Sequence, residues 1–342
     1  MKKITGFAGM VILVGAVIAA VFNTAYVDAG CGGGGGGASL PPALEVCAFT
    51  DQTSNVSAIA ISSDNKKVAS GGSDKTVRVW DVGAKSKAVK LSGHTGSVES
   101  VCFSYDNTTL ASGSGDKTVK IWDLASGKEK LVLSGHAGSV TAIAYSNDGK
   151  FIATGSADKT AKIWETASGK ELFSLAGHTK SVTELAFSFD NKMLASGGSD
   201  KTVRLWDVSS GKLQFSFAGH TDKISAIAFS TDNKLIASAS DDKSIKIWDA
   251  ASGGKALHTL TGHTKPAVSV KFSTDGKKLY SAGKDKFVKL WDVYAGTWSS
   301  GITWYSEYTE DIEYASFSAK SQYLVAGSNK KTVRLWDTSR LQ

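Results

Sequence analysis

Short alternating runs of apolar and polar residues follow one another along most of the chain. Segments such as SVESVCFS at 97–104 and TVKIWD at 118–123 place an apolar side chain at nearly every second residue, and Gly, Asp and Asn separate the segments. Alternation with a period of two predicts β-strands, and the intervening residue types predict tight turns. The pattern therefore predicts an all-β domain of short strands between residues 44 and 342.

The strand pattern repeats itself seven times. A Trp-Asp pair, once Trp-Glu, recurs at steps of 42, 42, 42, 42, 43 and 45 residues. The seven tryptophans are Trp80, Trp122, Trp164, Trp206, Trp248, Trp291 and Trp336. Each unit holds four short strands and leaves no room for a long helix. A period of this length is typical of a repeat architecture in which each unit buries its apolar face against its neighbours.

Three further positions are fixed within the repeat. Five units carry Gly-His with the histidine 28 residues before the tryptophan, six carry an Asp-Lys turn six residues before it, and a Ser or Thr stands four residues before that Asp. The five complete sets are His94/Ser112/Asp116/Trp122, His136/Thr154/Asp158/Trp164, His178/Ser196/Asp200/Trp206, His220/Ser238/Asp242/Trp248 and His263/Ser281/Asp285/Trp291.

With its Gly-His start and Trp-Asp end, the unit resembles the WD-repeat (tryptophan-aspartate repeat) family of β-propellers. The resemblance covers roughly residues 44–342. It implies blades of four antiparallel strands arranged around a central channel. It also implies that each complete set is a structural hydrogen-bond network running from the Asp turn through His and Ser or Thr to the indole N–H.

The two ends of the repeat region predict how the ring closes. The segment LEVCAF at 44–49 aligns with the end of an outer strand, with Phe49 on Leu260, and no inner strands precede it. The chain ends five residues after Asp337, so the seventh unit has only three strands. We expect the spare first strand to complete the last blade, which removes exposed sheet edges. The predicted fold is a seven-bladed propeller closed by its N-terminal strand.

The Ser, His and Asp of each set are also the ingredients of a nucleophilic triad. Five copies around a ring argue against that interpretation, because an enzyme needs one active site. The histidines are spread over five blades and cannot converge on a metal ion. The chain also lacks a P-loop, a dinucleotide-binding glycine fingerprint and a G-x-S-x-G motif. We predict a protein that is not an enzyme and binds no cofactor or metal.

The seventh unit departs most from the repeat. It has Glu307-Tyr308 in place of Gly-His, Ala326 in place of the hydroxyl residue and Lys330 in place of the turn Asp. Two explanations stand: drift in a blade held by two chain ends, or a face remodelled for a partner.

Aromatic residues gather just before that unit. Both tryptophans outside the Trp-Asp pairs lie in the segment YAGTWSSGITWYSEY at 294–308. Exposed Trp and Tyr are typical anchors of interfaces. Trp298, Trp304 and Tyr308 are therefore candidate partner-binding residues, with local packing between the last two blades as the alternative.

The head of the chain differs from the rest. Residues 4–27 carry no charge and follow Lys2 and Lys3; as a helix they span about 36 Å, enough to cross a bilayer. We predict a signal-anchor helix at 1–27, with a signal peptide cleaved near Ala29, or lipidation of Cys31, as alternatives. Residues 28–43, with six consecutive glycines, predict a flexible linker. The positive-inside rule puts the propeller on the extracytoplasmic side, as an anchored or a secreted and periplasmic domain.

Composition and charge add little. The net charge is +7 and the pI is near 9.0, but the basic residues are evenly spread and each turn lysine stands beside its own Asp. We expect no nucleic-acid partner. The favoured function is a protein-protein interaction scaffold, a membrane-tethered accessory subunit whose partners are subunits of a larger complex. The alternative is a secreted or surface propeller that binds a small ligand or carbohydrate.

Overall fold

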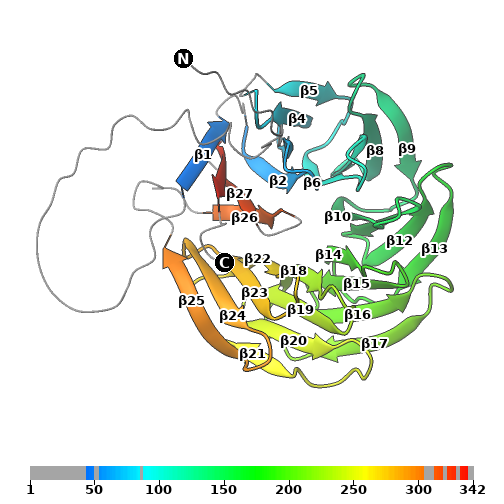
Figure 1. Cartoon of the computed structure of the whole chain (residues 1–342). Coiled ribbons are helices and arrows are strands. Elements are labelled where there is room, and N and C mark those ends of the chain that lie inside the picture. The colour runs from blue at the N-terminus through cyan, green and yellow to red at the C-terminus, as the bar shows by residue number, and fades with distance from the viewer. Residues whose placement is uncertain are drawn as a thin grey trace, which may run out of the picture. The chain divides into compact units, whose positions relative to one another are not determined.

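The computed structural model describes residues 44–49, 54–84, 88–303, 312–318, 322–328 and 332–337. Its strands form seven four-stranded antiparallel sheets that stand around a ring (Figure 1). This confirms the predicted seven-bladed all-β propeller. The hydrophobic helix and the linker predicted at 1–27 and 28–43 lie outside the described residues. Within the described ranges, no helix is long and apolar enough to cross a membrane.

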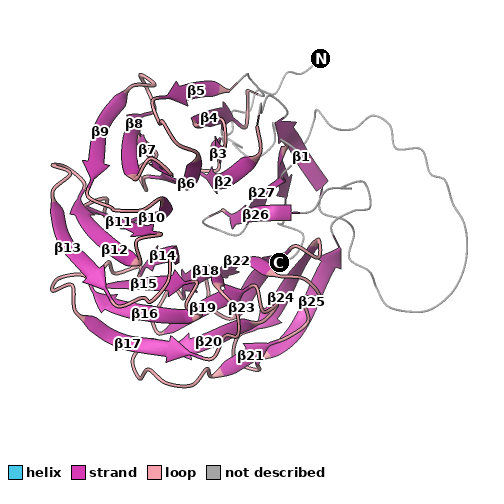
Figure 2. Ribbon diagram, turned by 180° about the vertical axis from the view of Figure 1, so that it is seen from behind, coloured by secondary structure: helices cyan, strands magenta, loops and turns pink. Residues whose placement is uncertain are grey.

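In each of blades one to six, the four strands follow one another in chain order from the centre of the ring outward. The view from the other side shows the same arrangement (Figure 2). The innermost strands are β2 (Val56–Ile61), β6 (Val98–Phe103), β10 (Val140–Tyr145), β14 (Val182–Phe187), β18 (Ile224–Phe229), β22 (Ala267–Phe272) and β26 (Ile312–Phe317). The second strands are β3 (Lys67–Gly72), β7 (Thr109–Ser114), β11 (Phe151–Ser156), β15 (Met193–Gly198), β19 (Leu235–Ser240), β23 (Lys278–Gly283) and β27 (Tyr323–Ser328).

The third strands carry the tryptophans. They are β4 (Thr76–Asp81), β8 (Thr118–Asp123), β12 (Thr160–Glu165), β16 (Thr202–Asp207), β20 (Ile245–Asp249), β24 (Phe287–Asp292) and β28 (Val333–Asp337). The outer strands are β5 (Val89–Ser92), β9 (Glu129–Ser134), β13 (Glu171–Ala176), β17 (Leu213–Ala218), β21 (His258–Leu260), β25 (Thr297–Thr303) and, for blade seven, β1 (Leu44–Phe49).

The first strand of the domain completes the last blade, as predicted. β1 pairs antiparallel with β28, and Phe49 stands opposite Val333 just as Leu260 stands opposite Ile245 in blade five. Phe49 is buried and its ring lies 5.0 Å from that of Trp80 in blade one. Strand β1 therefore joins blade seven to blade one through a shared apolar core.

Each blade buries its face against the next one. The core cluster between blades five and six joins Ile247 and Leu260 of the first to Leu279 and Trp291 of the second, all buried. Small residues on the second strands let the neighbouring blade approach. A Cβ added to Gly155 would lie 2.7 Å from Val182 of the next blade, which leaves no space for a side chain.

In four of the seven blades, a hydroxyl group at the second position of the inner strand donates a hydrogen bond to the next blade. Thr183 donates to the carbonyl of Ile224 in the next blade at 2.7 Å, and Ser57 donates to Val98 at 2.8 Å. Thr141 and Ser225 make the same bond to Val182 and Ala267. These bonds fix the register of neighbouring blades close to the axis.

Phe49→Ala tests the closure. Removing a buried Phe side chain costs about 3–5 kcal/mol of unfolding free energy, and here it weakens the joint between the chain ends. We expect a lower midpoint of urea unfolding, measured by tryptophan fluorescence. Tyr105→Ala, which truncates an exposed aromatic ring of blade two, is the control and should change little. Equal effects of the two variants would contradict a stabilising closure.

Candidate functional site

The repeated polar residues meet in every complete blade. In blade two the His94 Nδ1 lies 2.8 Å from an Asp116 carboxylate oxygen, and His94 Nε2 lies 2.8 Å from Ser112 Oγ. The indole N–H of Trp122 donates to the same Ser112 Oγ at 2.8 Å. The chain of contacts ties the loop before the inner strand to the second and third strands of the blade.

The same contacts recur in blades three to six with nearly constant lengths. The His Nδ1 to Asp distances are 2.8–2.9 Å, the His Nε2 to hydroxyl distances 2.7–2.8 Å and the indole N–H to hydroxyl distances 2.8 Å. The members are His136, Thr154, Asp158 and Trp164; His178, Ser196, Asp200 and Trp206; His220, Ser238, Asp242 and Trp248; and His263, Ser281, Asp285 and Trp291.

The electrostatics of the network favour neutral histidines in blades two to five. Burial lowers the pKa of His94 more than the neighbouring Asp116 raises it. Burial opposes ionisation of Asp116, but hydrogen bonds from Thr118, Thr95 and His94 outweigh it and hold the pKa of this carboxyl well below its usual range. A neutral His94 therefore donates its Nδ1–H to the carboxylate and accepts the Ser112 hydroxyl proton at Nε2.

The geometry does not suit nucleophilic catalysis. Ser112 is fully buried, and its oxygen already accepts the indole N–H of Trp122, so no substrate reaches it. Every polar atom of the set has a partner inside the blade, and the set stabilises the loop that it holds. In the described part of the chain, no group of three or more His, Cys, Asp or Glu side chains is placed to hold a metal ion.

The first and last blades differ, as their sequences indicate. In blade one, Asp74 accepts the Thr76 hydroxyl and pairs with Arg78 at 2.8 Å. In blade seven, the fully buried Ala326 occupies the hydroxyl position. Glu307, Tyr308 and Lys330 lie outside the described residues.

Of the three candidate partner-binding residues, the structure places Trp298, while Trp304 and Tyr308 lie outside the described residues. Trp298 is on the outer strand of blade six, opposite Trp291, and is 61% exposed. The Lys289 amine lies 4.7 Å from the centre of its ring. At the equivalent positions of blades two and three, Glu129 and Glu171 form ion pairs with the corresponding lysines, so Trp298 replaces a salt bridge by a cation–π contact.

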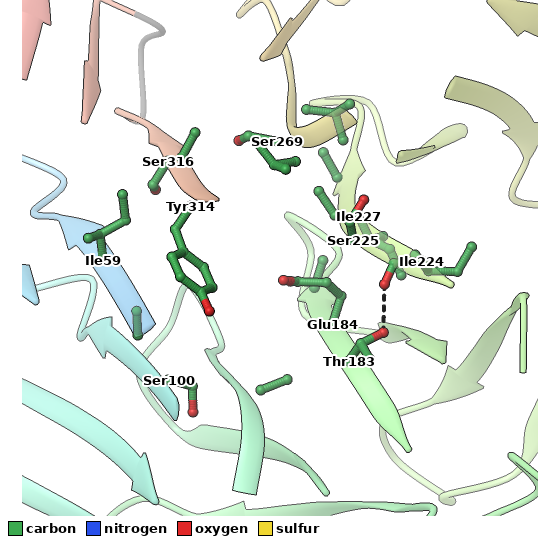
Figure 3. A pocket seen from close by; sticks show the side chains of 18 of the residues that line it. Ile59, Ser100, Thr183, Glu184, Ile224, Ser225, Ile227, Ser269, Tyr314 and Ser316 are labelled. Atoms are coloured by element: carbon green, nitrogen blue, oxygen red, sulfur yellow. Dashed lines mark hydrogen bonds between the residues drawn. The ribbon is translucent and has the colours of Figure 1, made fainter. Parts of the chain in front are cut away.

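A second candidate site was not found from the sequence. The inner strands enclose a central cavity of about 630 Å³. Most blades place a small residue at the third position of the inner strand, but blade four has Glu184 and blade seven has Tyr314. Both side chains project into the same space from different sides of the channel (Figure 3). At the fifth position, blade six likewise replaces a small residue by Lys271.

These exceptions are titratable groups in a confined space. Burial raises the pKa of Glu184 to about 8 and also raises the pKa of Glu99 in blade two. Burial lowers the pKa of Lys271. The signal was present in the sequence, since an alignment of the seven units shows Glu, Tyr and Lys where the other units have Ala, Ser or Cys. Only the fold shows that those positions line one channel.

Ser196→Ala tests the stabilising role of the network. The variant leaves the buried indole N–H of Trp206 and the Nε2 of His178 without their partner, which costs about 1–3 kcal/mol of unfolding free energy. Ser210→Ala removes an exposed hydroxyl that bonds to Asp207 and serves as the control. Urea unfolding of both variants measures the difference, and an equal small loss would contradict the role.

A pH dependence follows from the neutral histidines. Burial lowers the pKa of His220 below its value of 6.5 in an unfolded chain, so below about pH 6.5 the unfolded state binds a proton that the folded state does not. The wild type should therefore lose stability relative to His220→Gln as the pH falls through this range, by at most about 1.4 kcal/mol per pH unit. Titrating groups that His220 does not contact cancel in this comparison of urea unfolding curves, and measurements above pH 5 keep Asp242 ionised in both proteins. A difference that does not change with pH would contradict a buried neutral histidine.

Comparison with known proteins agrees with the fold. The family model described as WD domain, G-beta repeat (WD40), matches residues 45–81, 85–123, 127–165, 169–207, 211–249, 254–292 and 302–337. A search of curated proteins found no match. Each matched segment from the second onward begins near an outer strand and ends at a Trp-Asp or Trp-Glu pair, so the sequence repeat is offset from the structural blade by one strand. The seven matches cover most of the chain, and the chain belongs to the WD40 repeat family.

Proposed function

We propose that this protein is a membrane-tethered accessory subunit that holds other proteins together on the extracytoplasmic side of a membrane. WD40 propellers generally act as non-enzymatic scaffolds that bind other proteins. The membrane tether is inferred from the uncharged stretch at 4–27, which follows Lys2 and Lys3 in the chain. The inference of a larger complex depends on an exposed surface of blades five and six.

That surface, called here the aromatic hairpin surface, consists of Leu257, Tyr294 and Trp298. Their side chains are 52%, 69% and 61% exposed. Tyr294 and Trp298 belong to the hairpin between β24 and β25. The turn of this hairpin packs against blade five, since a Cβ on Gly296 would lie 2.2 Å from His258 Nδ1. Large exposed apolar side chains on a rigid support are the arrangement that interface hot spots use.

The support is rigid because the hairpin is fixed on both sides. Lys289 stacks on Trp298, and Lys278 bonds to both Asp292 and Ser299 near the ends of the two strands. Side chains held in this way lose little conformational freedom when a partner binds, which favours affinity. The single observation that carries the scaffold proposal is this exposed aromatic pair, of which Trp298 is held in place by Lys289.

The test is the native mass of the full-length protein extracted from its own membranes in mild detergent. We expect a particle much larger than the 35.8 kDa chain with its micelle, containing further proteins in fixed proportion. Trp298→Ser should reduce those proteins by about tenfold, the loss expected for a hot-spot residue. Tyr105→Ser, which changes an exposed aromatic residue on blade two, is the matched control and should keep them.

Each part of the proposal has its own contrary outcome. A lone monomer in the membrane fraction would contradict the subunit role. A soluble protein that begins near Gly30 would contradict the tether and indicate a secreted propeller. Equal recovery with Trp298→Ser and Tyr105→Ser would move the contact away from the aromatic hairpin surface.

A further inference from the structure

The central channel holds unpaired charges of both signs. Most charged groups on its wall pair locally: Lys223 lies 3.4 Å from Asp241, and Lys284 pairs with Glu313. Three others on the same cavity wall, Glu99, Glu184 and Lys271, form no ion pair within the described residues.

The carboxylates and the amine stand at different levels of the channel. The innermost strands start their blades and run in the same direction, so equal positions lie at equal levels. Glu99 and Glu184 are at the second and third positions of their strands, and Lys271 is at the fifth. Two residues along a strand place the backbone of Lys271 about 7 Å further along the strand direction than that of Glu184. The Lys271 amine leans further toward the end of the strands, 5.8 Å from the ring of Phe189 in the loop after β14.

A hydrogen-bonding aromatic group stands beside the carboxylates. Tyr314 is 39% exposed, and it is the largest side chain at the third position. Burial raises the pKa of Tyr314, and the charges of Glu99 and Glu313 add to this rise. Glu99, Glu184 and Tyr314 all line the same cavity.

Unpaired charges in a confined space are unfavourable. Burial disfavours the ionised forms of Glu184 and Lys271, and no neighbouring charge offsets this for either group. Their separation prevents them from neutralising each other. A molecule with a positive group at one end and a negative group at the other would satisfy both, and the cavity of about 630 Å³ is in the size range of ligand pockets.

We propose that the channel binds a small zwitterion, with its ammonium group among Glu99, Glu184 and Tyr314 and its carboxylate at Lys271. The phenol and carboxylate oxygens accept hydrogen bonds from the ammonium group, and the lysine amine donates to the carboxylate. The small side chains of the other blades leave the cavity open for the part of the ligand between its two charged ends. This site is independent of the aromatic hairpin surface, which lies on the outer strands.

The site makes binding depend on pH. Glu184 is largely protonated at neutral pH, because its pKa is about 8, and an ammonium group favours its ionised form. Binding should therefore release a proton below about pH 8 and become tighter as the pH rises toward that value. The other titratable groups that line this cavity are Glu99, Tyr314, Lys271 and the two ion pairs Lys223–Asp241 and Lys284–Glu313.

The test is calorimetric titration of the full-length protein with 6-aminohexanoate, which carries an ammonium group and a carboxylate at opposite ends of a flexible chain. Hexylamine and hexanoate carry one of the two charges each and serve as probes of the separate ends. We expect 6-aminohexanoate to bind about tenfold more tightly than either single-charge probe. We also expect proton release near neutral pH, detected as a dependence of the heat on the buffer.

Two variants test which residue binds each end of the ligand. Glu184→Gln should weaken 6-aminohexanoate about tenfold and remove most of the proton release, and Lys271→Gln should weaken 6-aminohexanoate and hexanoate but not hexylamine. Glu165→Gln and Lys170→Gln remove exposed charges of blade three and are the matched controls. Urea unfolding checks folding, and neither channel variant should lower stability, since each replaces an ionisable group that has no ion-pair partner within the described residues by a neutral amide.

The proposal is overturned if 6-aminohexanoate does not bind in the millimolar range, if the single-charge probes bind as well as it does, or if the channel variants bind like their controls. None of these results bears on the scaffold function, because Trp298→Ser and the native mass report on a different surface. Loss of the partner proteins in Glu184→Gln with Trp298 intact would likewise contradict a separate small-molecule site.

Discussion

The structure depends on the burial of each blade between two others. A four-stranded sheet of short strands has two faces, and here the apolar core lies between blades, as where Trp291 of blade six packs against Leu260 of blade five. No blade has a complete core of its own, so the stability of each one depends on an unbroken ring. The pairing of β1 with β28 therefore supports the whole molecule, because it joins the last blade to the first.

The axis imposes a second constraint. Seven inner strands converge on it, and most blades carry small side chains at the third and fifth positions of these strands. Hydroxyl groups at the second position use the close approach to bond to the next blade, as Thr183 does to Ile224. Glu184, Tyr314 and Lys271 are therefore exceptions at these two positions, and they add polar groups to the cavity wall.

The repeated polar residues and the exceptional ones have different roles. The sets such as His178, Ser196, Asp200 and Trp206 are buried and fully partnered, so they hold loops in place. Glu184, Lys271 and Trp298 occur once each at positions where other blades have another residue type. A repeat protein gains a distinctive binding surface from residues that occur in only one repeat, because the residues shared by all repeats are needed for the structure of each blade.

The sequence by itself determined the architecture. The spacing of Trp-Asp pairs, the strand alternation and the alignment of Phe49 with Leu260 were enough to predict seven blades and the way the ring closes, because each blade is built from local contacts repeated at a fixed period. It also brought out Trp298 as an unusual residue. The tertiary structure alone decided that Trp298 stacks with Lys289 on an outer strand, and that Glu184, Tyr314 and Lys271 line one cavity. Those residues lie in different blades, up to 130 positions apart in the chain from Glu184 to Tyr314, and only closure of the ring brings them together around the axis.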